Sequence, residues 1–137
     1  MAKSEKKIEF LFSCLYSKDD INVSVSNQIG VKVRSLFSEM TLKCLKENVP
    51  DEVPGIVFLS GGQSNELATA HLNEMNKVKN DYKWNLSFSY GRALQQSALK
   101  TWLGKDENLK AAQHAFGHRA LMNKNAALGA WNQSQEG

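Results

Sequence analysis

The stretch that decides the fold is Pro54-Gly55-Ile56-Val57-Phe58-Leu59-Ser60-Gly61-Gly62-Gln63-Ser64. Pro54-Gly55 is a turn signal. The apolar run over residues 56–59 is short and rich in β-branched and aromatic side chains, which predicts a strand buried on both faces. Ser60-Gly61-Gly62 ends this strand. Ser64 then stands where it can cap a helix that begins at Asn65, with an acid in the first turn, where the helix dipole favours one.

A strand that ends in Ser-Gly-Gly and leads into a helix is a candidate anion site. Glycine leaves the backbone N–H groups open to an anion, and the hydroxyl of Ser60 can donate to it. The alternative is a plain strand-to-helix connection, because two adjacent glycines are weak evidence by themselves. Spacing alone leaves both interpretations open.

A second strand is predicted over residues 84–90, where apolar and small polar residues alternate without a break. Such alternation suits an antiparallel sheet with one face in water, or a closed parallel barrel with a crowded, partly polar centre. Gly91 and Arg92 open the next helix, and the guanidinium fork suits phosphate oxygens. The helix between the two strands favours parallel pairing through a right-handed crossover. Five residues are then expected to converge on one phosphate: Ser60, Gly61, Gly62, Ser89 and Arg92.

The remaining helices are predicted from apolar spacing. One helix is expected from about Val33 to Lys46, stopped by Asn48-Val49-Pro50. Residues 8–15 suit a short amphipathic helix, residues 21–27 a strand exposed on one face, and residues 27–30 a turn. Three helices are expected to carry apolar residues at helical spacing: Leu67, Ala68, His71, Leu72 and Met75; Leu94, Ala98, Leu99 and Trp102; and Leu109, Ala112, Phe116, Ala120 and Leu121.

Composition limits the classes of function. The chain has 137 residues and a net charge of +3, with cations interleaved with acids, which favours a solvated surface over a nucleic-acid face. Cys14 and Cys44 form no CxxC pair, which argues against zinc and a disulfide scaffold and favours a reducing, cytoplasmic setting. No apolar run approaches the roughly 20 residues of a membrane span. His71 could be a metal ligand, but a helix-edge position with satisfied ring nitrogens is favoured, and no metal is expected.

Residues from about 40 to 131 resemble the C-terminal part of class I fructose-1,6-bisphosphate aldolase. The motifs that carry the resemblance are Val53 to Ser64, then Leu72-Asn73-Glu74-Met75-Asn76, then Leu86-Ser87-Phe88-Ser89-Tyr90-Gly91-Arg92-Ala93-Leu94-Gln95. The resemblance implies an α/β chain that forms the last two strands and flanking helices of a TIM (β/α)8 barrel. It also implies a glycolytic lyase, usually a homotetramer, that needs no metal or other cofactor. Its substrate, fructose 1,6-bisphosphate, is split into dihydroxyacetone phosphate and glyceraldehyde 3-phosphate.

Carried over residue by residue, Ser60, Gly61 and Gly62 match the family's phosphate loop after the seventh strand. Ser89 and Arg92 match its partners after the eighth strand, with the Gly91 amide beside them. Phosphate sites after the last two strands are common in such barrels, so the resemblance and the residue spacing point to the same place.

The departures from the family concern the covalent chemistry. The family forms a Schiff base on a lysine of the sixth strand, within a Leu-Leu-Lys-Pro-Asn type motif that does not occur here. No lysine of this chain is nominated as the nucleophile, and no residue is assigned a catalytic role. Leu103 stands where the family usually has glycine, and the final residues lack the tyrosine-ended tail of the animal enzymes.

We therefore expect an unmatched segment over residues 1–37 and an aldolase-type barrel part over residues 38–137. The favoured interpretation is an aldolase by descent that keeps its phosphate loops and is inactive alone. One alternative is a non-catalytic phosphate-binding or interaction module. The other is an active enzyme assembled with a separate N-terminal polypeptide.

Overall fold

The computed structural model describes residues 27–78 and 82–137. In chain order the elements are α2 (Asn27–Asn48), β1 (Gly55–Phe58), α3 (Asn65–Lys77), β2 (Asn85–Phe88), α4 (Arg92–Trp102), the 3-10 turn η1 (Asp106–Asn108), α5 (Leu109–Ala127) and the 3-10 turn η2 (Gln133–Glu136). The helix expected over residues 8–15 lies outside the described residues, as does nearly all of the strand expected over residues 21–27.

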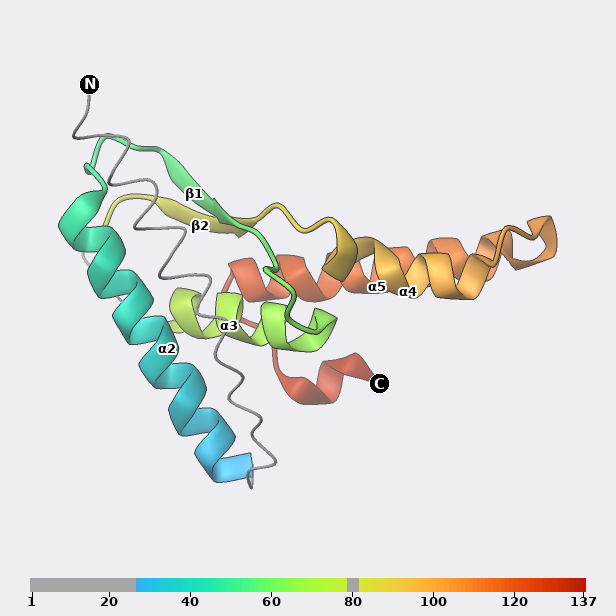
Figure 1. Ribbon diagram of the computed structural model, residues 1–137, viewed down its shortest axis with the longest axis horizontal. Coiled ribbons are helices and arrows are strands. Elements are labelled where there is room, and N and C mark those ends of the chain that lie inside the picture. The colour runs from blue at the N-terminus through green and yellow to red at the C-terminus, as the bar shows by residue number, and fades with distance from the viewer. Residues whose placement is uncertain (1–26, 79–81) are drawn as a thin grey trace.

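The two strands pair in parallel, as the sequence predicts. Ile56 lies opposite Leu86 and Phe58 opposite Phe88. The pairing extends past both ends, because the Asn85 amide donates to the Pro54 carbonyl at 3.1 Å and the Ser89 amide donates to the Phe58 carbonyl at 2.8 Å. Figure 1 shows the strands side by side, with α3 running beneath them and α4 and α5 extending away from α2. The antiparallel alternative is therefore excluded for this pair.

The burial of β1 differs from the prediction. Phe58 is 5% exposed, but Val57 is 62% exposed and Leu59 is 59% exposed. The expectation of a strand buried on both faces is wrong here, because no part of the chain that the structure describes covers the outer face. The alternation over residues 84–90 is confirmed: Trp84, Leu86 and Tyr90 are buried in the core.

The first described helix begins earlier than expected. Residues 27–30 form the first turn of α2 instead of a separate turn. They contain no proline, and one interior glycine costs a helix only about 1 kcal/mol, so the helix continues through Gly30. It ends at Asn48, two residues beyond the predicted Lys46 and just before Pro50. The boundary between residues 37 and 38 falls inside α2 and stays a prediction.

The apolar stripe predicted for α5 is mostly at the surface. Leu109, Phe116 and Leu121 are 41–49% exposed. The helix instead buries small and polar side chains: Ala112, Arg119, Met122, Asn123 and Ala126. Arg119 and Asn123 hydrogen-bond to α3, and these contacts set the rotation of α5 about its axis. The stripe predicted for α4 is also partly exposed, at Leu99 and Trp102.

Candidate functional site

The loop after β1 is a tight turn. The Gln63 amide donates to the Ser60 carbonyl at 3.0 Å. The central residues, Gly61 and Gly62, have φ angles of 54° and 86°, in a region that L side chains rarely adopt. Both glycines are exposed, whereas Ser60 is buried. The Gly-Gly pair thus lets the chain reverse after the strand and leaves the turn open to solvent.

The next residues confirm the predicted helix start. The Ser64 side chain accepts a hydrogen bond from the Leu67 amide at 3.1 Å, and α3 begins at Asn65. Glu66 lies in the first turn. The exposed Gly-Gly turn is therefore followed directly by a capped helix, whose N-terminal dipole favours negative charge.

The loop after β2 lies against the loop after β1. Ser89 is held at the end of β1 by its amide hydrogen bond to Phe58. Gly91 occupies the N-cap position of α4. Arg92, the first residue of α4, donates to the Gln63 carbonyl and, at 3.2 Å, to the Gln96 side chain. The guanidinium therefore reaches from the second strand end to the turn at the first.

The five predicted residues lie on two loops that follow the ends of one parallel pair, and the hydrogen bonds described above join these loops through Ser89 and Arg92. Arg92 contacts the turn through Gln63, and none of the hydrogen bonds found in residues 27–78 and 82–137 joins it to Ser60, Gly61 or Gly62. No described hydrogen bond links the hydroxyls of Ser60 and Ser89 either. Gln63 is a further residue of this turn that the sequence motif does not predict as part of the site; its position directly after two glycines is the signal that points to it.

His71 borders the turn and has a partner there. Its Nδ1 lies 3.0 Å from Oε1 of Gln63, and its ring stacks on Phe37 with centroids 4.5 Å apart. Burial lowers the pKa of His71 to about 4; Arg34 adds to the lowering and Glu74 opposes it. The prediction of a helix-edge histidine with a satisfied ring nitrogen is confirmed for Nδ1. No group of three or more potential metal ligands occurs among the described residues.

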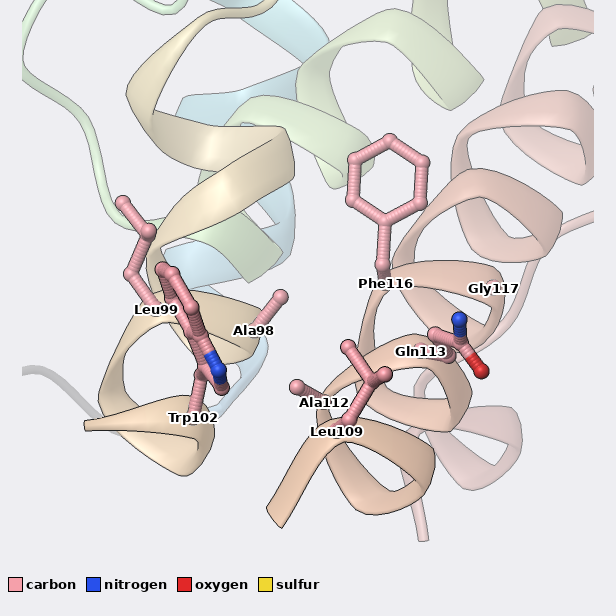
Figure 2. A pocket seen from close by; sticks show the side chains of 8 residues that line it. All are labelled: Ala98, Leu99, Trp102, Leu109, Ala112, Gln113, Phe116 and Gly117. Carbon is pink, nitrogen blue, oxygen red and sulfur yellow. The ribbon is translucent and has the colours of Figure 1, made fainter. Parts of the chain in front are cut away.

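A separate apolar hollow lies between α4 and α5. Figure 2 shows Leu99 and Trp102 of α4 on one side, and Leu109, Ala112 and Phe116 of α5 on the other. Its volume is about 410 Å³. None of its lining residues comes from the loops that follow β1 and β2. Its almost wholly apolar lining makes it unsuitable for a phosphate.

A buried ionic cluster joins the C-terminal turn to the helices. Arg119 is 3% exposed and donates to Thr69 Oγ1 at 2.6 Å and to the Asn65 carbonyl at 3.2 Å. It also pairs with Glu136, which accepts from the Trp131 indole at 2.9 Å. The last residues, expected only to be polar, are therefore attached to α3 and α5. We assign this cluster a structural role.

Comparison with known proteins places this geometry in a family. The sequence profile of the glycolytic class-I fructose-bisphosphate aldolases matches residues 17–137. The chain belongs to this aldolase family. Fructose-bisphosphate aldolase 6, cytosolic, of Arabidopsis thaliana is 57% identical over 96 residues, which are 70% of this chain and 27% of that aldolase. The cytoplasmic aldolase isozyme of Spinacia oleracea is 55% identical over 94 residues, 69% of this chain and 26% of its own.

A solved aldolase structure agrees with the sequence comparison. The Plasmodium falciparum aldolase, solved in a ternary complex with TRAP and a small-molecule inhibitor, superposes with a TM-score of 0.70 at 43% identity. The match covers 72% of this chain and 28% of that aldolase. The family is a TIM-barrel family, and this chain spans about a quarter of the length of the aldolases it matches. No helix within the described ranges is long and apolar enough to cross a membrane.

Proposed function

We propose that this chain is the C-terminal portion of an aldolase-type TIM barrel and holds one phosphate of fructose 1,6-bisphosphate. The observation that carries the proposal is the reach of Arg92 from the end of β2 to the Gly61-Gly62 turn at the end of β1. Parallel strands end at the same edge of a sheet, and such edges are where α/β enzymes bind phosphates. We propose a cytoplasmic setting, because the two plant relatives are named cytosolic and cytoplasmic aldolases.

The donors for a phosphate come from both loops. The Ser60 and Ser89 hydroxyls and the amides of Gly61, Gly62 and Gly91 are neutral donors, and Arg92 supplies positive charge. A guanidinium has five N–H groups. Arg92 directs one bond to the Gln63 carbonyl and one to Gln96, so further N–H groups remain for phosphate oxygens.

The covalent step of class I aldolases needs a lysine that these 137 residues do not supply in the family's motif. The lysine amine would add to the substrate ketone and lose water, and the resulting iminium would take up the electron pair of the broken carbon–carbon bond. The proposal therefore gives this chain phosphate binding without catalysis when it is alone. The family usually assembles as a homotetramer, and we extend that assembly only to a complete barrel, not to this chain alone.

Replacing Arg92 with alanine tests the phosphate site. Inorganic phosphate is expected to shift the Gly61 and Gly62 amide NMR signals of the wild-type chain in a saturable way. Hydrogen bonds from a charged donor contribute about 1.5–3 kcal/mol, so Arg92→Ala is expected to weaken phosphate binding by about 10- to 100-fold. Lys100→Ala removes an exposed cation from the same helix and is the matched control. Equal losses in the two variants would reject a specific role for Arg92.

A cleavage assay tests the absence of catalysis. The purified 137-residue chain is expected to show no turnover of fructose 1,6-bisphosphate above buffer and no borohydride-trapped substrate adduct. Turnover that borohydride abolishes would show that one of its lysines forms the Schiff base. An intact reading frame for the other strands directly upstream would favour an enzyme assembled from two polypeptides. Remnants of those strands in another frame would favour a disrupted aldolase gene.

A further inference from the structure

Gln63 connects three parts of the candidate site. Its amide closes the turn on Ser60, and its carbonyl accepts from the Arg92 guanidinium. Its side-chain Oε1 lies 3.0 Å from Nδ1 of His71. The same residue therefore shapes the Gly-Gly turn, holds the arginine, and is itself bound through its side chain to α3.

His71 is well placed to restrain Gln63. It lies in the middle of α3, and its ring stacks on the ring of Phe37 in α2. Because an amide oxygen only accepts hydrogen bonds, the hydrogen of this contact lies on Nδ1 of His71. Burial keeps the ring neutral at physiological pH, with its pKa at about 4. The donor ring of His71 thus belongs to α3 and packs against α2, and it stays neutral at physiological pH.

The turn needs such a restraint, because its two glycines give the backbone unusual freedom. Glycine loses more conformational entropy on ordering than any other residue. Gly61, Gly62 and Arg92 are all exposed, so packing does not immobilise them. A loop that is already ordered before its ligand arrives pays less of this entropy on binding.

We infer that His71 and the Gln63 side chain are positioning residues for the phosphate loop. The ring of His71 donates to the Gln63 amide oxygen, and this bond holds the turn, and Arg92 through the Gln63 carbonyl, in the arrangement that receives phosphate. Neither side chain contacts the phosphate. The inference rests on the proposed function.

The test titrates the full chain with inorganic phosphate and follows the Gly61 and Gly62 amides by NMR. His71→Phe keeps a ring against Phe37 but removes the donor. Loss of one neutral hydrogen bond is expected to weaken phosphate binding about three- to tenfold. His71→Asn places an amide N–H close to where Nδ1 stands, and binding within about twofold of wild type is expected. A role for His71 in packing alone would predict the reverse order.

A second variant probes the same bond from its other end. Gln63→Met keeps a side chain of similar length but removes the amide oxygen that accepts from His71. It is expected to weaken phosphate binding as much as His71→Phe does. The double variant is expected to bind no more weakly than either single variant. Gln113→Met, at an exposed position of α5, is the control. If circular dichroism shows that His71→Phe is unfolded, the phosphate titration of Gln63→Met alone tests the inference.

The outcomes distinguish a failure of the proposed phosphate site from a failure of the positioning role of His71 and Gln63. A wild-type chain that gives no phosphate response overturns the proposed function and this inference with it. A normal wild-type response that Gln63→Met leaves unchanged overturns the inference alone. Weakening in both variants, with recovery in His71→Asn, supports it.

Discussion

Replacing Arg119 with methionine is expected to lower the free energy of unfolding by about 3–5 kcal/mol, because it removes one partner of a buried ion pair. The Glu136 side chain is 12% exposed and would lose its cation, keeping the Trp131 indole and a His118 contact at 3.6 Å. Thr69 Oγ1 and the Asn65 carbonyl would lose donors as well. Small domains are stable by only about 5–15 kcal/mol, so this loss is a large share of the total.

Urea denaturation followed by circular dichroism measures the effect. Lys124→Met is the control, because Lys124 is an exposed cation of the same helix and its loss is expected to change stability by less than about 0.5 kcal/mol. If the two substitutions cost the same, the buried cluster contributes nothing specific. A selective loss for Arg119→Met would confirm that the C-terminal turn is held to α3 and α5 through this side chain.

Acidification is expected to destabilise the chain by roughly 2–3 kcal/mol through His71 alone. The folded-state pKa of His71 is about 4, against 6.5 for an unperturbed histidine. Between these two values the unfolded chain binds more protons than the folded chain, so stability falls as the pH drops from about 6.5 to about 4. Below pH 4 both states are protonated, and above 6.5 both are neutral, so the contribution of His71 is constant outside this window.

The loss of stability comes from protonating a buried imidazole ring. Protonation leaves the Nδ1 hydrogen bond to Gln63 in place, but it puts a positive charge in a desolvated position near Arg34, which Glu74 offsets only in part. Stability measured between pH 4 and 7 in wild type and in His71→Asn gives the difference due to this ring, since the other groups titrate in both chains. Parallel pH curves for the two proteins would refute the assignment.

Much of the site could be predicted because its signals are local. A positive φ needs glycine, a cap needs a short polar side chain, and a helix between two strands favours a parallel pair, and each of these is readable from a few consecutive residues. The turn at Gly61-Gly62, the Ser64 cap and the parallel pairing of residues 55–58 with residues 85–88 follow from such signals. The contact between Gln63 and His71 joins residues on different elements, and no local pattern specified it.

Burial differs from what residue type alone predicts at several apolar positions. Leu109, Phe116 and Leu121 recur at helical spacing but lie at the surface, because α5 turns Arg119 and Asn123 toward α3. Buried polar side chains that hydrogen-bond to one another can occupy a helix interface, and a sequence pattern cannot show which polar residues find partners. Val57 and Leu59 are exposed for a related reason, since the burial of a strand depends on what lies on each of its faces.

The sequence by itself determined the family, the order of strands and helices, and the glycine, serine and arginine residues of the proposed phosphate loops. These properties reside in short motifs whose conformational demands are met within a few residues. Only the tertiary structure decided which face of β1 and of α5 is buried, that Arg119 ties the last turn to α3, and that His71 meets Gln63. These contacts depend on how helices far apart in the chain are rotated against one another, and that rotation is set by the packing of all of them together.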